Sequence, residues 1–254
     1  YVSSGGNPLL LTEIIQGAFV GGDFAKGSLR DGCLLPNNLA QALERRLHTV
    51  DPKLVPMLSW LAAWQGRAEF SQLSSHFFGG VGASQEELID QLEALVRHQL
   101  VVREGKGYFL LPQVAKVVLD ALTPEARREL QKQMALALQN TTFHERIGYH
   151  WLAAGRPEMA REPMLAAAQA QSSLYNYGRA LELYQMVEQL PGPPVDNLGR
   201  LKAEALLGWH QPEPAYELFK QLNNADPSLE LLLKMGECQW YQGHFQRSYQ
   251  LLAE

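Results

Sequence analysis

The residues that come closest to a metal site are His144, Glu145 and His150. In a zinc protease two histidines stand four residues apart on a helix, because that spacing turns both imidazoles toward one ion. His144 and His150 are six residues apart, which places them on different faces of a helix. Cys33 and Cys238 are far apart and have no Cys or His neighbour at ligand spacing. We therefore predict no metal site.

Nucleotide hydrolysis would need a phosphate-binding loop of the form Gly-x4-Gly-Lys-Ser/Thr, whose backbone N–H groups and lysine cradle the phosphates. In residues 21–28 the letters Ala-Lys-Gly-Ser stand out of order, and residues 79–82 contain no lysine. No Ser/His/Asp or Cys/His set has supporting local context either. The sequence thus predicts no catalytic residue, and we do not expect this stretch of chain to be an enzyme by itself.

A DNA-reading helix must tolerate the phosphate backbone. The candidate helix over residues 84–100 exposes four carboxylates, Glu86, Glu87, Asp90 and Glu93, against only Arg97 and His98. The whole chain carries a formal net charge of −5. These charges predict a surface that faces solvent or protein, and they argue against DNA as the partner.

By composition, the chain divides into three zones. Residues 1–35 form the first. Asn7 can cap a short helix there, and Pro8 suits the first helical position because its missing N–H costs nothing. A glycine-rich stretch over residues 21–32 then predicts a loop or linker.

Residues 36–123 form the second zone, with helices followed by a hairpin. Apolar residues at helical spacing predict helices over residues 39–47, 54–64, 69–78, 84–100 and 114–122. Ser84 and Glu87 form a capping box at the start of the fourth of these. Two β-prone runs, 100–103 and 108–111, flank Glu-Gly-Lys-Gly, which predicts a hairpin. Three helices followed by a hairpin is the order of a winged helix.

Residues 124–254 form the third zone, which reads as helix after helix. Ala180, Ala215 and Ser248 recur close to the ~34-residue period of tetratricopeptide repeats. Four positions beyond each stands a large apolar residue, in the order Tyr184, Phe219 and Leu252. The same offsets appear upstream in Gly148, Trp151, Gly155 and Ala160. Because Ala160 and Ala180 are too close for a full period, the helix over residues 157–174 is predicted to serve two successive repeats.

The fold class that follows is mainly α: a winged-helix-like domain with a small β-hairpin, followed by a tetratricopeptide-like α-solenoid. Most aromatic residues of the repeats are expected in the core. Tyr175, Tyr177 and Trp209 flank inter-helix junctions, so we predict that they line a groove for a partner or ligand.

The order of these landmarks resembles the region that follows the nucleotide-binding core in bacterial STAND-type AAA+ ATPases, the large LuxR-type and maltose-regulator-type transcription activators. The resemblance rests on residues 4–11, 35–47, 58–64, 87–100, 108–109, 122–128 and 149–155. It implies that Gly6, Asn7 and Pro8 supply one wall of an adenine site, which other sequence would complete to bind ATP or ADP. Plain helix capping explains the same three residues without a ligand.

The resemblance further implies a cytoplasmic signalling protein whose winged helix locks the nucleotide in the resting state. Its repeats would receive a protein or small-molecule inducer, and its active form would oligomerise. One departure stands out, since the family often has a His or basic residue just after the second wing strand, whereas residues 109–113 read Phe-Leu-Leu-Pro-Gln. This departure argues against phosphate sensing by this domain.

The leading interpretation is a regulatory and interaction region of a STAND-type signal-transduction ATPase, part of a transcriptional regulator, with no cofactor held by this stretch alone. Two alternatives stay open: a non-catalytic repeat scaffold that has lost nucleotide sensing, and a winged-helix DNA-binding regulator. No apolar run reaches the ~20 residues that a membrane span needs. Because the chain opens at Tyr1 and stops within a helix at Glu254, we expect a fragment whose repeats continue.

Overall fold

The computed structural model describes residues 39–64, 66–78 and 84–253. Gly6, Asn7, Pro8 and Cys33, and with them the whole first zone, lie outside these ranges. The chain divides into two compact units, Tyr1–Leu130 and Gln131–Glu254, and each is described by itself. The division falls inside a helix, a few residues after the boundary between 123 and 124 that the sequence suggests.

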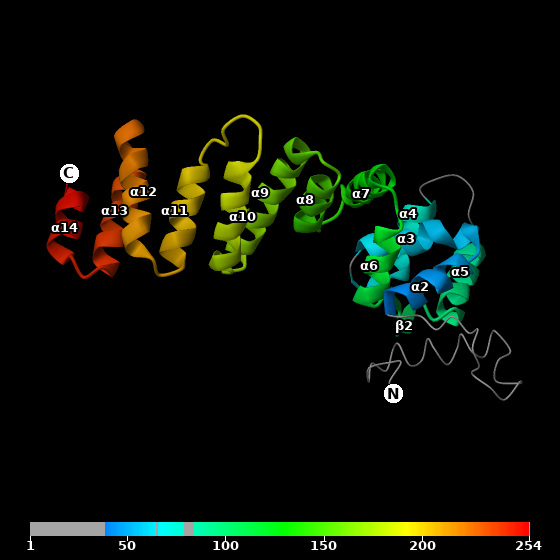
Figure 1. Cartoon of the computed structure of the whole chain (residues 1–254). Coiled ribbons are helices and arrows are strands. Elements are labelled where there is room, and N and C mark those ends of the chain that lie inside the picture. The colour runs from blue at the N-terminus through cyan, green and yellow to red at the C-terminus, as the bar shows by residue number, and fades with distance from the viewer. Residues whose placement is uncertain (1–38, 65, 79–83, 254) are drawn as a thin grey trace, which may run out of the picture. The chain divides into compact units, whose positions relative to one another are not determined.

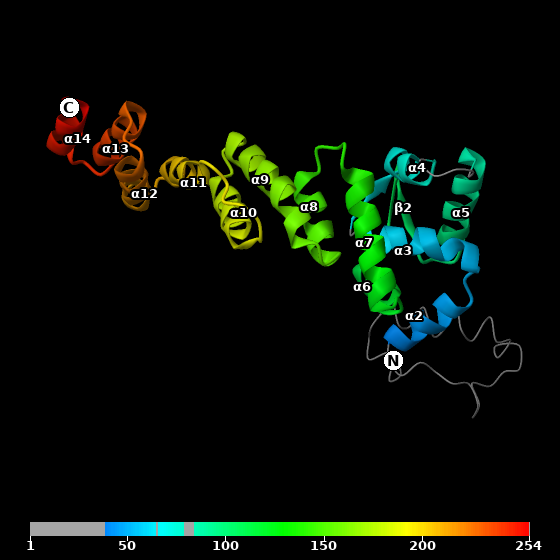
Figure 2. The ribbon, with the colours of Figure 1, turned by 90° about the horizontal axis from the view of Figure 1, so that it is seen from above.

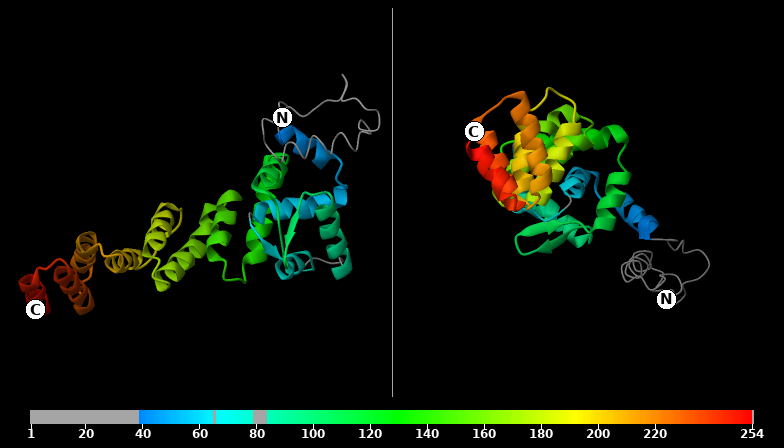
Figure 3. Two further views of the ribbon diagram at one scale, coloured as in Figure 1. Left: turned by 90° about the horizontal axis from the view of Figure 1, so that it is seen from below. Right: turned by 90° about the vertical axis from the view of Figure 1, so that its left-hand side faces the viewer.

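The first unit is winged-helix-like. Its described elements are α2 (Leu39–His48), a 3-10 turn (Pro52–Leu54), α3 (Val55–Trp64), β1 (Ala68–Glu69), α4 (Phe70–Phe78), α5 (Gln85–Arg97), β2 (Val102–Glu104), β3 (Gly107–Phe109) and α6 (Pro112–Asp120). The three strands form one small antiparallel sheet in the order β1-β3-β2 (Figure 3). The hairpin is confirmed, and β1 is a third strand that the sequence analysis assigned to no strand.

The core of this unit is built around α3, which is buried on every side from Met57 to Trp64. The rings of Trp60 and Trp64 stack with centroids 5.0 Å apart, and α3 packs against α6. At the start of α5 the predicted capping box is present. Glu87 N–H donates to Ser84 Oγ over 3.2 Å, and Ser84 N–H donates to the Glu87 carboxylate over 3.1 Å.

The second unit is a run of helices in which each helix from α8 to α13 packs against the one that follows it, up to α14 (Figures 1 and 2). The elements are α7 (Pro124–Leu138), α8 (His144–Ala153), α9 (Pro157–Ser173), α10 (Tyr177–Gln189), α11 (Leu198–Gly208), α12 (Pro212–Ala225), α13 (Leu229–Tyr241) and α14 (Phe245–Ala253). This arrangement confirms the mainly α, solenoid-like class predicted from the helical period. No helix in the described ranges is long and apolar enough to span a bilayer.

Small residues allow consecutive helices to approach closely. Four buried pairs stand twelve residues apart: Gly148 with Ala160, Ala168 with Ala180, Ala203 with Ala215, and Gly236 with Ser248. A Cβ on Gly148 would lie 2.7 Å from Met164 Cγ, and Ser248 Oγ donates to the Gly236 carbonyl over 2.8 Å. Because α9 carries both Ala160 and Ala168, it packs on α8 through one and on α10 through the other. The prediction that this helix serves two repeats is confirmed.

Candidate partner-binding site

The structure brings together the three aromatic residues predicted for a partner groove. Tyr175 lies in the turn between α9 and α10, Tyr177 begins α10, and Trp209 caps the end of α11. The ring centroids of Tyr175 and Tyr177 are 6.1 Å apart in an edge-on arrangement. Residues separated by more than thirty positions in sequence therefore share one surface.

Two glycines hold this cluster together. A Cβ on Gly208 would lie 2.4 Å from Tyr177 Cζ, so the tyrosine ring rests directly on the end of α11. In return, Trp209 Cζ2 lies 3.5 Å from the Cβ position of Gly178 on α10. Each helix thus presents a bare glycine to an aromatic ring of the other, and α10 and α11 are held in register at this end.

The cluster is exposed, unlike the aromatic core of the repeats. Tyr175 is 79% exposed, the adjacent Leu174 is 72% exposed and Trp209 is 50% exposed, whereas Tyr184 of the core is 1% exposed. We call Leu174, Tyr175, Tyr177 and Trp209 the aromatic patch. Contiguous exposed apolar surface of this kind marks interaction sites on proteins, because solvated aromatic area gains free energy when a partner covers it.

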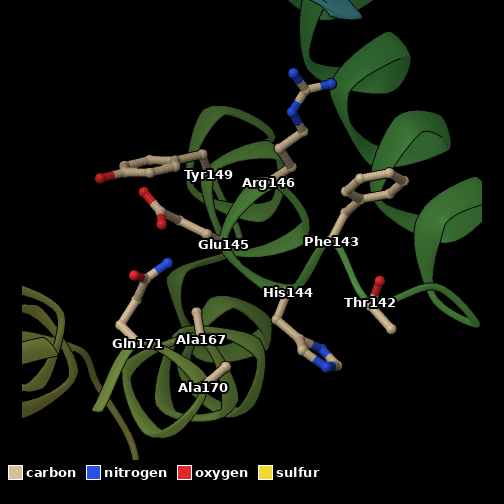
Figure 4. Close-up of a pocket in the computed structure, with 9 residues that line it drawn as sticks. All are labelled: Thr142, Phe143, His144, Glu145, Arg146, Tyr149, Ala167, Ala170 and Gln171. Carbon is tan, nitrogen blue, oxygen red and sulfur yellow. The ribbon is translucent and has the colours of Figure 1, made fainter. Parts of the chain in front are cut away.

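A pocket with a volume of about 330 Å³ opens between α8 and α9 (Figure 4). Its lining consists of Thr142, Phe143, His144, Glu145, Arg146, Tyr149, Ala167, Ala170 and Gln171. In Figure 4 Glu145, Tyr149 and Gln171 gather on one side, with Thr142 and Phe143 on the other. Asn176, which stands between Tyr175 and Tyr177, donates from Nδ2 to Gln171 Oε1 over 2.9 Å. The pocket rim and the patch are thereby linked.

Arg179 pairs with two carboxylates at this rim. Its guanidinium, on the first turn of α10, pairs with the carboxylates of Glu145 and Glu182 and donates to the Tyr149 hydroxyl over 2.9 Å. The hydrogen bonds to Glu145 and then Glu182 raise the pKa of Arg179, so the cation persists at every accessible pH. Arg179 is thus engaged by groups of the protein itself.

The two histidines weighed as metal ligands do not meet. His144 lines the pocket, whereas His150 is 7% exposed and its Nδ1 lies 2.6 Å from Oε1 of the buried Gln131 on α7. Burial, followed by the nearby charge of Arg146, lowers the pKa of His150 to about 4. This neutral, buried imidazole is a packing element. Gln131, its partner, went unnoticed in the sequence because a lone glutamine carries no pattern that marks it as buried.

The surface of α5 has the charges that its sequence suggested. Glu86, Glu87, Asp90 and Glu93 are exposed together, and Arg97 follows at the end of the helix. Four carboxylates on one exposed surface repel a phosphate backbone.

In α13 the thiol of Cys238 is buried, and burial, followed by the charge of Glu237, raises its pKa to about 11, so it is a packed, unreactive group.

Comparisons with known proteins give one distant likeness. No protein-family model matches the chain, and no curated protein matches it. Among solved structures, a Signal Transduction ATPase with Numerous Domains (STAND) protein with a tetratricopeptide repeat sensor, from Pyrococcus horikoshii, is similar with a TM-score of 0.45 and 14% identity. The likeness covers 99% of this chain and 42% of that one, so this chain spans less than half the length of that protein. A likeness of this size establishes neither a family nor a function.

Proposed function

We propose that this chain is the regulatory and interaction region of a STAND-type signal-transduction ATPase, within a cytoplasmic transcriptional regulator. In this proposal the helical repeat receives the activating partner, a protein or a small inducer. The winged-helix unit relays nucleotide state, and the active form oligomerises. Support comes from the resemblance of the sequence landmarks to such proteins and from a repeat that exposes the aromatic patch.

The observation that carries the interaction part of the proposal is the exposure of the aromatic patch. Leu174, Tyr175 and Trp209 are each at least half exposed, although Trp209 and Tyr177 are fixed in place by the glycines beneath them. A rigid aromatic surface binds with little loss of side-chain entropy. Because Leu174 and the three aromatic side chains of the patch carry no charge, an apolar segment of a partner protein fits the patch better than a charged one.

The first test is selection of twelve-residue peptides from a displayed random library on the full chain, followed by affinity measurement on variants. Trp209→Ala is expected to weaken binding of a selected peptide at least tenfold, because central aromatic residues dominate interface energies. Tyr249→Ala is the matched control, since Tyr249 is 74% exposed but lies on α14, outside the patch. If both substitutions weaken binding equally, or if Trp209→Ala has no effect, the patch is not the interaction site.

The ATPase part of the proposal has a separate test. A chain extended upstream is expected to contain a Gly-x4-Gly-Lys-Ser/Thr loop, and its thermal midpoint should rise when ADP is added, because a ligand that binds only the folded state stabilises it. The same extended chain with the loop lysine replaced by alanine is the control. Absence of the loop, or an ADP response that persists in the control, removes the ATPase reading and leaves the repeat scaffold.

A further inference from the structure

The pocket between α8 and α9 has a polar wall, formed by Glu145 and Gln171 (Figure 4). Residues at the start of α10 hold both side chains. The Glu145 carboxylate accepts from the guanidinium of Arg179. Gln171 Oε1 accepts from Asn176 Nδ2 over 2.9 Å, and the Gln171 carbonyl accepts from Asn176 N–H, also over 2.9 Å. The wall is therefore oriented before any ligand arrives, which lowers the entropy cost of binding.

Each of these two side chains keeps one polar group unused. In the described ranges of the chain, no group of the protein bonds Glu145 Oε2 or the side-chain nitrogen of Gln171. The wall thus offers a hydrogen-bond acceptor next to a donor. Its complement is a donor next to an acceptor, which is the arrangement of an uncharged primary carboxamide.

Charged groups of the same shape fit this wall less well. A carboxylate would set a second anion against Glu145. An amidinium would pair with Glu145 but would point its second nitrogen donor at the donor of Gln171. Arg146, the arginine of the lining, has its guanidinium over the Phe143 ring, 5.9 Å from the ring centroid, and is directed away from the polar wall in Figure 4. It therefore does not change this pattern.

The lining also has an apolar part, formed by Phe143, Ala167 and Ala170. The Phe143 side chain is 38% exposed, and the two alanines present only methyl groups. The pocket volume of about 330 Å³ lies at the lower end of the roughly 300–1,000 Å³ that small-molecule sites occupy. This space suits a single ring attached to the carboxamide.

We propose that this pocket binds a small uncharged molecule in which a primary carboxamide is attached to an apolar ring. The amide nitrogen donates to Glu145 Oε2, and the amide oxygen accepts from the side-chain nitrogen of Gln171. The inference rests on the proposed function, in which the repeat receives an activating partner, and it names the site and the chemistry of a small inducer. Through Arg179 and Asn176 the occupied wall is joined to the start of α10.

Benzamide, benzamidine and benzoate test this chemistry, because they share one ring and differ in the charge and hydrogen-bonding pattern of the attached group. The readout is the methyl resonances of Ala167 and Ala170 in the full chain with isotope-labelled alanine, and the methyl group of Ala203 on α11 is the internal control. Benzamide is expected to shift the two pocket resonances saturably, with a dissociation constant on the order of 1 mM. Benzamidine and benzoate are each expected to bind about fivefold more weakly or worse.

Replacing the donor of the wall should invert this preference. Gln171→Glu can still accept from Asn176 but turns a second acceptor toward the pocket, so benzamidine is expected to bind about tenfold more tightly than benzamide. Gln169→Glu is the matched control, because Gln169 is exposed on the same helix outside the lining and adds the same charge. Benzamide should remain the preferred probe in that control.

A second variant keeps the test decisive if Gln171→Glu does not fold. Ala170 is exposed in the lining, so Ala170→Leu fills the pocket from its apolar side. This substitution is expected to weaken benzamide binding about tenfold or more. Unchanged benzamide affinity in Ala170→Leu would place the probe elsewhere and overturn the inference.

The carboxamide assignment is also overturned if benzamidine or benzoate is the tightest ligand of the unchanged chain, or if Gln169→Glu inverts the preference as Gln171→Glu does. Resonance shifts that grow linearly with benzamide, or that reach Ala203 equally, would show an adventitious additive only and would overturn it as well.

These results are separate from the peptide test. Peptide binding that is lost in Trp209→Ala, together with no saturable benzamide binding, leaves the proposed function standing and removes the pocket as a ligand site. Saturable benzamide binding with no peptide selected at the aromatic patch keeps the pocket and removes the patch as the interaction site.

Discussion

At the scale of single residues, His150 is a titratable group of the repeat whose charged form folding disfavours. His150 is buried against Gln131, and its pKa is lowered from 6.5 to about 4 because the charged imidazole would be desolvated. In the unfolded chain the same group binds a proton near pH 6.5. Folding is therefore favoured fully above that pH, and the stabilisation is lost progressively as the pH falls toward 4.

The expected loss from His150 between pH 7 and pH 4 is roughly 3 kcal/mol in the free energy of unfolding. Urea unfolding of the full chain at several pH values measures it. His150→Gln cannot titrate and should flatten this part of the pH profile. A profile identical in the unchanged chain and in His150→Gln would show that the imidazole is not held neutral by folding.

At the scale of helices, glycines that look alike in the sequence have opposite roles. A Cβ on Gly148 would lie 2.7 Å from Cγ of the fully buried Met164, whereas a Cβ on Gly178 would meet Trp209 at an ordinary 3.5 Å. Gly148→Ala is expected to destabilise the chain by about 1–2 kcal/mol, because α8 and α9 must separate. Gly178→Ala is expected to stabilise it by up to about 1 kcal/mol through helix propensity. Chemical denaturation of both variants checks the pair, and equal signs would contradict the close packing of α8 on α9.

Local sequence patterns predicted the helix caps, the helical periods and the hairpin, but they did not predict the strand β1. The capping box at Ser84 and Glu87 and the small residues at Ala180, Ala215 and Ser248 were predictable, because caps and helical periods are set by neighbours along the chain. The strand β1 was missed because two residues, Ala68 and Glu69, are too few to show an alternating pattern. It exists only because β3 pairs with it.

The candidate site was predictable in part for a similar reason. Tyr175, Tyr177 and Trp209 could be proposed because they stand at breaks between helices. The left-handed conformation of Tyr175 and His210 could not be predicted, because glycine is the residue type that usually indicates it. Likewise, the pairing of Arg179 with Glu145 joins α10 to α8 and depends on how α9 holds those two helices together.

At the scale of the whole molecule, the chain separates into a winged-helix-like unit and a helical repeat. The aromatic patch and the pocket both belong to the repeat. Partner recognition is thus proposed for the second unit, while the acidic surface of α5 in the first gives no support to DNA as that partner. The expected relay of nucleotide state would then begin with a partner bound at the patch.

The most direct measurement is the indole N–H spectrum of the full chain during titration with the selected peptide. The sequence has five tryptophans, and substitution of Trp209 by phenylalanine assigns its resonance. The resonance of Trp209 is expected to shift as the peptide binds. Trp240, which is 60% exposed on α13, serves as the internal control and should not move. A peptide that shifts Trp240 and leaves Trp209 unchanged would contradict partner binding at the aromatic patch.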